Sequence, residues 1–354
     1  MKNLFDICIF TLGCKVNQTE GFELGERFLE KGFTVIHELQ SANNYIINTC
    51  SVTQEADSKS RQCISRALKQ NKDAKIFVIG CASEFDKSAF EGRDNVELVV
   101  GAKDKSTAFE QILPFVRTNV IGYTNFIKKE IKTSRRRAYI KIQDGCDNYC
   151  SYCIVPYLRG ASTSKPLEEI ILEAKNLEGK VDEIAFTGIC ISDYKIDGEL
   201  SLKKLIAEFQ QIKIPKKFIG SLTPTIVDEE LLRTLSQSGF CPPFHLSVQS
   251  GSDTVLRRMN RNYAAKEMLE KIDLIRRVFP KAEITADIIA GFPKESEMEF
   301  NETLEFIKQA NFTDIHAFPY SAKKGTVAEK LPQLPMSLRK ERVKIIKNIH
   351  IKKT

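Results

Sequence analysis

Short apolar runs alternate with longer amphipathic stretches along the first third of the chain. Each apolar run is bounded by turn-forming residues and is short enough to be a buried strand. We expect these strands at residues 5–12, 45–48, 76–79 and 96–100. The amphipathic stretches predict helices at residues 19–31, 54–70 and 86–91. Because strands and helices alternate, the economical topology is a parallel sheet of βα units.

The same alternation returns in the second part of the chain, where the helices are longer. We expect strands at residues 138–143, 183–187, 217–222, 244–249, 284–289 and 314–320. Amphipathic helices between them are expected at residues 166–177, 228–238, 264–279 and 295–309. Six successive βα units predict an open or closed parallel barrel with its chemistry at the carboxyl ends of the strands. The expected fold class is therefore α/β, with a parallel-sheet βα domain followed by a partial (βα)6 barrel.

A poorly periodic stretch rich in Lys and Arg, residues 122–137, separates the two series, and we interpret it as a linker. A chain of 354 residues is also too long for one ordinary core, so two domains are expected. The predicted organisation is an N-terminal domain at 1–121, a basic linker at 122–137, a barrel at 138–330 and a basic C-terminal helix at 331–354.

The composition is that of a folded globular protein, with 42% apolar and 28% charged residues. The apolar stretches are shorter than the ~20 residues that a membrane span needs, and no signal segment opens the chain. We therefore expect a soluble cytoplasmic protein that has no membrane partner.

The net charge of +7 is concentrated in two basic segments, at residues 128–141 and from residue 339 onward. Such patches on a mildly acidic body indicate a polyanionic partner such as RNA. Arg135, Arg136 and Arg137 are the candidate RNA contacts. The alternative, that these residues only keep the protein soluble, remains open.

Ten cysteines are more than packing requires, and a cytosolic redox environment makes structural disulfides improbable. Cys14, Cys50 and Cys81 each follow the carboxyl end of a predicted strand. In a parallel sheet these ends meet at one edge, which is where ligands bind. The three cysteines therefore predict a shared metal site.

A second cysteine set has the spacing CxxxCxxC and follows the first predicted barrel strand, with Cys146, Cys150 and Cys153 as its members. Thiolates select zinc or iron–sulfur clusters. Zinc sites usually have four protein ligands, whereas this loop offers three and no nearby histidine. An iron–sulfur cubane held by three cysteines would leave one iron open. A zinc loop with a distant fourth ligand is the alternative.

The other cysteines match no ligand spacing and are interpreted as small buried hydrophobic residues. These are Cys8, Cys63, Cys190 and Cys241, with a role for Cys190 or Cys241 left open. The histidines are scattered along the chain, so no histidine-centred metal site is predicted.

The CxxxCxxC pattern, with Tyr152 before its last cysteine, resembles the radical S-adenosylmethionine (SAM) superfamily. In that superfamily the open iron binds the amino acid end of SAM and passes one electron to its sulfonium, which releases a 5′-deoxyadenosyl radical. The N-terminal cysteine segments resemble the methylthiotransferases of this superfamily, at residues 11–18, 48–53 and 80–81. The resemblance continues in order at residues 141–160, 249–261, 287–293 and 318–321.

This resemblance implies SAM and two [4Fe-4S] clusters as cofactors. Cys146, Cys150 and Cys153 would hold the SAM-cleaving cluster, and Cys14, Cys50 and Cys81 would hold a second, sulfur-supplying one. No catalytic side chain is expected beyond these ligands. The expected SAM contacts are Tyr152, Thr187, Gln249, Ser250, Asp287 and Gly291. An electron donor such as flavodoxin or ferredoxin is an implied partner.

Within the family, Gly-Cys-Lys-Val-Asn-Gln at residues 13–18 resembles the MtaB type. That type converts N6-threonylcarbamoyladenosine at position 37 of tRNA to its 2-methylthio derivative, so tRNA is the implied partner. Members generally continue into a small RNA-binding barrel called TRAM, which we expect to be absent here. The alternatives are a RimO-type enzyme that methylthiolates a ribosomal protein aspartate, and a non-catalytic zinc-stabilised RNA-binding protein.

Overall fold

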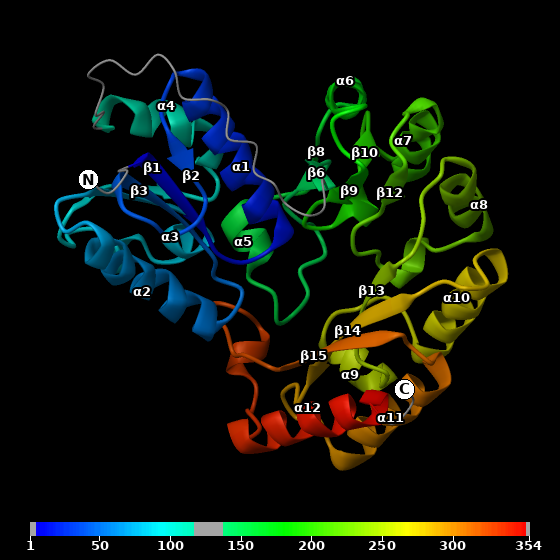
Figure 1. The fold of residues 1–354 in the computed structure, drawn as a ribbon. Helices are drawn as coiled ribbons and strands as arrows, with labels where there is room; N and C mark the ends of the chain where they lie inside the picture. Colours follow the sequence, from blue (N-terminus) through cyan, green and yellow to red (C-terminus); the bar gives the residue numbers. More distant parts are fainter. Residues whose placement is uncertain (1–4, 117–136, 352–354) are drawn as a thin grey trace. The chain divides into compact units, whose positions relative to one another are not determined.

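The computed structural model describes residues 5–116 and 137–351, and it divides into two compact units (Figure 1). The N-terminal unit contains the chain up to residue 133 together with residues 154–160. The barrel unit contains residues 134–153 and 161–354. Residues 154–160, which the sequence analysis placed in the barrel domain, thus pack with the N-terminal unit. The predicted linker lies outside the described residues except for Arg137, which opens a strand.

The N-terminal unit is built on a five-stranded parallel sheet with the order β2-β1-β3-β4-β5. Its strands are β1 (Phe5–Thr11), β2 (Val35–Ile36), β3 (Ala42–Thr49), β4 (Lys75–Gly80) and β5 (Val96–Gly101). The four strands expected from the apolar runs are confirmed. β2 was missed because two residues leave no periodicity to detect.

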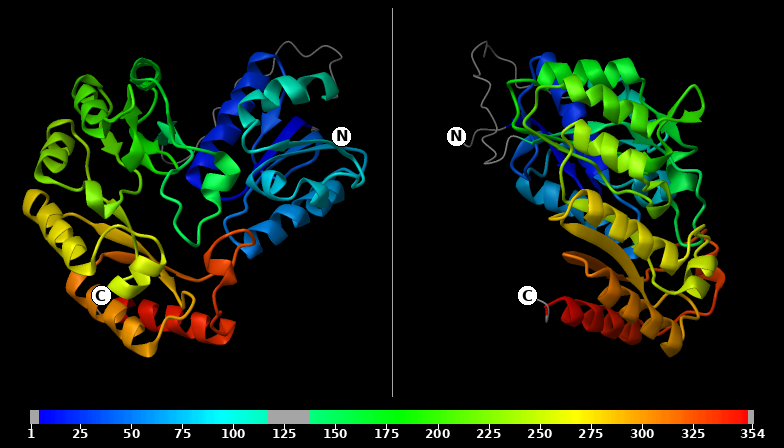
Figure 2. Two further views of the ribbon diagram at one scale, coloured as in Figure 1. Left: turned by 180° about the vertical axis from the view of Figure 1, so that it is seen from behind. Right: turned by 90° about the vertical axis from the view of Figure 1, so that its right-hand side faces the viewer.

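Both faces of this sheet are apolar because helices cover both (Figures 1 and 2). Alternate residues of β3 point to opposite sides: Tyr45 and Ile47 enter one buried cluster, and Ile46 enters another. The helices of the unit are α1 (Lys15–Glu30), α2 (Gln54–Gln70), α3 (Cys81–Phe85), α4 (Ala108–Ile112) and α5 (Val155–Arg159). The α2 helix supplies the first cluster, and α1 and α4 supply the second.

The helix predicted at residues 86–91 is wrong. An α-helix ends at Phe85, and a 3-10 helix follows at Lys87–Ala89. Between them the backbone of Asp86 leaves the helical region, with φ −150° and ψ 86°, and its carboxylate accepts a hydrogen bond from the amide of Ala89 as a helix cap. Aspartate favours such caps over helix interiors, and it separates the two short helices.

The six predicted strands of the barrel unit are present, and they form two three-stranded parallel sheets with the orders β12-β9-β6 and β13-β14-β15. They are β6 (Arg137–Lys141), β9 (Glu183–Thr187), β12 (Lys216–Phe218), β13 (Phe244–Gln249), β14 (Ile284–Ala290) and β15 (Asp314–Pro319). The strand expected at 217–222 ends at Phe218, and the single bridge between Leu222 and Leu246 links it onward to β13. The α/β fold class with a parallel N-terminal sheet is confirmed.

Two short antiparallel pairs accompany these sheets. They are β7 (Gln143–Asp144) with β8 (Thr163–Ser164), and β10 (Lys195–Ile196) with β11 (Glu199–Leu200). The helices of the unit are α6 (Leu167–Leu177), α7 (Leu202–Glu208), α8 (Glu229–Gln237), α9 (Asp253–Arg258), α10 (Ala265–Val278), α11 (Glu297–Ala310) and α12 (Met336–Ile351). In the part of the chain that the structure describes, no helix is both long and apolar enough to cross a membrane.

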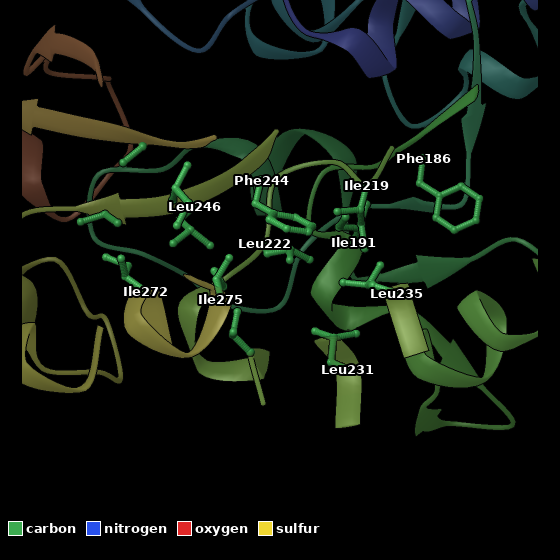
Figure 3. Packing of buried hydrophobic residues seen from close by; sticks show 14 of the residues in the cluster. Phe186, Ile191, Ile219, Leu222, Leu231, Leu235, Phe244, Leu246, Ile272 and Ile275 are labelled. Atoms are coloured by element: carbon green, nitrogen blue, oxygen red, sulfur yellow. The ribbon is translucent and has the colours of Figure 1, made fainter. Parts of the chain in front are cut away.

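One continuous apolar core joins the strands to the helices on their outer side (Figure 3). In β14 the buried positions alternate with half-buried ones, so Ile284, Ala286 and Ile288 face the core. Asp287 lies on the opposite face. This alternation is the reason that polar side chains gather on the inner face of the strands.

The α12 helix is fastened to the barrel unit by a buried ion pair. Arg342 Nη1 lies 3.2 Å from Glu295 Oε2, and both side chains are 2% exposed. Arg342 also donates to the backbone carbonyl of Glu295. The backbone after β14 approaches the same helix so closely that a Cβ at Gly291 would lie 2.6 Å from Arg339 Cγ.

Replacing Arg342 by Met should destabilise the barrel unit, because Glu295 would keep a buried carboxylate without its cation. We expect the free energy of unfolding to fall by about 3 kcal/mol, as measured by urea unfolding and circular dichroism. Adding Glu295→Gln should recover part of the loss. Lys308→Met, which removes an exposed pair with Glu305, should change stability by less than about 0.5 kcal/mol. Equal effects of the two single changes would contradict this account.

Candidate functional site

The N-terminal cysteine set lies at one edge of the parallel sheet. Cys14 caps the start of α1 just after β1, Cys50 follows β3, and Cys81 opens α3 directly after β4. Cys14 is exposed, and the other two are buried. Burial, with smaller contributions from Cys81 and Cys14, raises the pKa of the Cys50 thiol to about 11. A Cβ at Gly13 would lie 2.6 Å from Cys50 Sγ, so only glycine allows this approach.

Asn17 joins the loops that carry two of these cysteines. Its Nδ2 donates to the carbonyls of Leu12, over 3.0 Å, and Thr49, over 2.8 Å. Its Oδ1 accepts from Lys105 Nζ, over 3.0 Å, and from Arg159 Nη2, over 2.7 Å. The side chain is fully buried, and this fixed amide therefore sets the spacing of the loops before Cys14 and Cys50.

Two buried cations lie beside Cys81. The side chains of Lys105 and Arg159 are 8% and 3% exposed, and both bond to the carboxylate of Glu20. Arg159 also donates to the Cys81 sulfur. Burial raises the pKa of the Cys81 thiol, while Arg159 and Lys105 act in the opposite direction. These cations favour the thiolate form that a metal requires.

The barrel cysteine set occupies the loop after β7, which is anchored by hydrogen bonds to the end of α9. The Ser151 amide donates to the Met259 carbonyl over 3.0 Å, and the Ser151 hydroxyl donates to the Arg258 carbonyl over 2.7 Å. Asn260 Nδ2 donates to the carbonyl of Tyr149 over 3.1 Å. The loop thus has a fixed conformation even though it is neither helix nor strand.

Gln143 supports the same loop from inside the barrel. Its Nε2 donates to the carbonyls of Asp144 and Gly145 and to the Ser162 hydroxyl, over 2.8 to 2.9 Å. Its Oε1 accepts the amide of Cys190 over 2.7 Å. The residue is 1% exposed, so its polar atoms depend on these partners.

Cys190 lies next to Cys146, and the spacing of the cysteines in the sequence does not predict this proximity. The sulfurs of these two residues and a carboxylate oxygen of Asp193 lie within 4.8 Å of one another. Asn148 Nδ2 is 3.3 Å from Cys146 Sγ and 3.4 Å from Cys190 Sγ. A hydrogen bond from Cys190 lowers the pKa of Cys146 to about 6.

The spacing of the sulfurs distinguishes a single ion from a cluster. Sulfur ligands around one zinc lie about 3.8 Å apart, because Zn–S bonds of ~2.3 Å are arranged tetrahedrally. Within the described residues, neither three-cysteine set has all its sulfurs within 4.8 Å of one another. The group formed with Cys190 is tighter but contains only Cys146 from the loop. A multi-iron cluster does not need sulfurs this close together, because each thiolate binds a different iron.

Three of the expected SAM contacts lie at the carboxyl ends of strands. Thr187 ends β9, Gln249 ends β13, and Gly291 follows β14. Tyr152 lies in the cysteine loop, and its ring packs edge to face against that of Phe292, next to Gly291, with 6.5 Å between the ring centres. Ser250 is buried, and its hydroxyl lies 3.2 Å from that of Thr303, so this side chain bonds within the barrel unit.

Asp287 lies in the middle of β14, between two histidines of neighbouring strands. Its Oδ2 is 3.1 Å from His245 Nε2, and its Oδ1 is 3.4 Å from His316 Nδ1. Thr285 Oγ1 lies 2.7 Å from the other nitrogen of His245 and fixes the ring. The sequence does not reveal this group, because its members are brought together only by strand register.

The structure describes one of the three candidate RNA contacts, Arg137. Arg135 and Arg136 lie outside the described residues. Arg137 Nε donates to Glu183 over 2.7 Å, and its guanidinium lies 4.5 Å from the ring centre of Phe218. The charge of Arg137 is thus shared with a carboxylate of the neighbouring strand.

Two family models match the chain. Residues 140–307 match the Radical SAM superfamily, and residues 6–101 match Uncharacterized protein family UPF0004. Among solved structures, the cobalamin-dependent S-adenosylmethionine radical enzyme OxsB with aqua-cobalamin bound has a TM-score of 0.56 at 13% identity. The match covers 98% of this chain and 56% of that chain, and it concerns the fold alone.

Curated relatives match over nearly the whole chain. The threonylcarbamoyladenosine tRNA methylthiotransferase MtaB of Chlamydia pneumoniae is 38% identical over 96% of this chain and 80% of its own length. The protein of the same name from Bacillus subtilis (strain 168) is 35% identical over 95% of this chain and 78% of its own length. The tRNA-2-methylthio-N(6)-dimethylallyladenosine synthase of a Wolbachia species from Brugia malayi is 31% identical over 97% and 82%. The chain therefore belongs to the radical SAM methylthiotransferase family.

Proposed function

We propose that this chain modifies tRNA by converting N6-threonylcarbamoyladenosine at position 37 to its 2-methylthio derivative. The observation that carries the proposal is that one chain presents two three-cysteine sets, one at the edge of the parallel N-terminal sheet and one in the loop after β7. Relatives named as threonylcarbamoyladenosine enzymes are 33 to 38% identical, whereas a dimethylallyladenosine synthase is 31% identical. This difference favours the threonylcarbamoyl substrate.

Membership of the radical SAM superfamily implies SAM and a [4Fe-4S] cluster. We assign Cys146, Cys150 and Cys153 as the cluster ligands. When bound, the two cofactors supply the one-electron chemistry needed to replace an aromatic C–H bond that has no acidic proton. The protein positions them: Ser151 and Gln143 fix the cysteine loop. We assign the edge around Thr187, Gln249 and Gly291 to SAM, together with Tyr152, Ser250 and Asp287.

We infer that Cys14, Cys50 and Cys81 hold a second [4Fe-4S] cluster that supplies the sulfur. The three cysteines follow adjacent strands of one parallel sheet, and the cations beside Cys81 favour its thiolate. Cys14 is the exposed member, so the site opens to solvent on that side. A one-electron donor such as flavodoxin or ferredoxin completes the requirements. Arg135, Arg136 and Arg137 stay candidates for contacts with tRNA phosphates.

Nucleoside mass spectrometry tests the proposed function directly. tRNA from cells that lack this gene should contain N6-threonylcarbamoyladenosine without its 2-methylthio form. Expression of the chain should restore the methylthio form, and expression of Cys150→Ala should not, because the radical step would lack its cluster. A methylthio group gained by a ribosomal protein instead of tRNA would contradict the proposal.

We expect the two cysteine sets to serve different steps of the reaction. Reconstituted protein should contain about eight irons, and Cys50→Ala should contain about four, since each set can hold one cubane. Cys50→Ala should still form 5′-deoxyadenosine from SAM but lose sulfur insertion, whereas Cys150→Ala should lose both activities. Liquid chromatography of 5′-deoxyadenosine and mass spectrometry of tRNA measure the two steps. A folded Cys50→Ala protein that methylthiolates tRNA would refute the second assignment.

Gln143 should be needed for the barrel loop to hold its shape. Gln143→Leu keeps the volume but leaves buried carbonyls and the Cys190 amide without partners. We expect the free energy of unfolding to fall by about 3 kcal/mol and the iron content of the barrel set to fall with it. Gln211→Leu, at an exposed position, is the control and should change neither. Urea unfolding and iron analysis measure the two effects. Equal stability and equal iron content in the two variants would contradict the role given to Gln143.

A further inference from the structure

A guanidinium contacts one sulfur of the barrel set. Arg261 follows α9, and its Nη1 donates to Cys150 Sγ over 3.3 Å. Its Nη2 donates to the carbonyl and the hydroxyl of Ser247, over 2.9 and 3.2 Å, and its Nε donates to the Tyr263 hydroxyl over 2.7 Å. The guanidinium is thus held through Nε and Nη2 by barrel residues, and Nη1 is directed to the cysteine loop.

The hydrogen-bond partners of Arg261 among the described residues include no carboxylate. They are the oxygens of Ser247 and Tyr263 and the sulfur of Cys150, and the Tyr263 ring centre lies 4.9 Å from the guanidinium carbon. One neighbouring arginine differs. Arg258 lies 2.7 Å from a carboxylate oxygen of Glu299. A partly buried cation without a counter-charge is unfavourable, so Arg261 requires that one of these partners carry a negative charge.

Cys150 provides that anion once it is a thiolate in a cluster. Three thiolates around an oxidised [4Fe-4S] core leave one net negative charge, and reduction adds another. A cation and hydrogen-bond donor at a ligand sulfur stabilises the more negative, reduced form. The position of Arg261 therefore suits a cluster whose negative charge increases on reduction.

We propose that Arg261 is a positioning residue for the SAM-binding cluster, which fixes the Cys150 thiolate and raises the reduction potential of the cluster. This inference rests on the proposed function. It gives Arg261 a role in the reaction that the cysteine spacing does not reveal: the cluster becomes reducible by a donor of moderate potential.

The role needs the shape of arginine as well as its charge. The fork binds Ser247, Tyr263 and Cys150 at the same time, whereas a lysine ammonium on a flexible stem cannot reach all three in this geometry. Arg261→Lys should therefore keep part of the effect through its charge. Arg261→Gln keeps a donor but loses the charge, so its effect should be larger.

The test uses the full chain carrying Cys14→Ala, Cys50→Ala and Cys81→Ala, in which only the barrel set can hold iron. Arg261→Gln and Arg261→Lys are compared in this parent with Arg276→Gln. Arg276 is a matched control because it donates to the backbone carbonyls of Ala310 and Asn311, over 2.6 and 2.7 Å, far in sequence from any cysteine ligand. The readouts are the reduction midpoint from electron paramagnetic resonance without SAM, and the rate of iron release to a chelator.

Arg261→Gln should shift the reduction equilibrium at least tenfold toward the oxidised form, about 59 mV for one electron, with at least tenfold faster iron release. Arg261→Lys should give smaller changes in the same direction, and Arg276→Gln should give neither change. A midpoint and a release rate for Arg261→Gln equal to those of the control would overturn the proposal.

Two further outcomes are also decisive. If both Arg261 variants fail to take up iron yet unfold at the temperature of the parent, the loss supports the role at Cys150. If both lose iron together with soluble yield and thermal stability, Arg261 is only structural and the proposal falls. A parent that binds no iron would contradict the assignment of the barrel cysteines, a failure of the proposed function that is visible before any Arg261 variant is made.

Discussion

Parallel strand pairing is the constraint on which the chemistry of this protein depends. In the N-terminal unit the register pairs Thr11 with Asn48 and Thr49 with Gly80, so three strands end at the same level. Each next turn of chain presents one cysteine, although these residues are far apart in the sequence. No local interaction among the cysteines is needed to gather them, because the ladder of backbone hydrogen bonds has already done so.

The loops that carry the cysteines contain backbone carbonyls that make no strand-to-strand hydrogen bond. In each unit one buried carboxamide side chain donates hydrogen bonds to these carbonyls. Asn17 binds the carbonyls before Cys14 and Cys50, and Gln143 binds those before Cys146. A carboxamide suits this task because it donates and accepts at once and carries no charge to desolvate. These hydrogen bonds make the loops rigid, and rigid loops keep the cysteine sulfurs at fixed distances from one another.

The sequence pattern predicted the strands, most helices and both cysteine sets, because apolar periodicity and ligand spacing are local signals. It failed at residues 86–91, where one capping aspartate outweighed helical periodicity. Contacts such as those of Cys190 with Cys146, or Arg261 with Cys150, follow from the folded arrangement of distant segments. They leave no trace in a single sequence, since each residue type is ordinary at its position.

The segment after Cys153 shows why a domain boundary drawn from periodicity can mislead. The α5 helix lies just beyond the barrel cysteines in sequence, yet it carries Arg159 into the N-terminal unit, where the side chain is 3% exposed. There it shares Glu20 with Lys105 and contacts Cys81. An N-terminal unit cut at residue 121 would therefore lose a cation from a buried group that includes one carboxylate and one cysteine. Such a cut removes part of the cysteine site itself, because a buried carboxylate that loses a bonding partner must either rearrange or take up a proton.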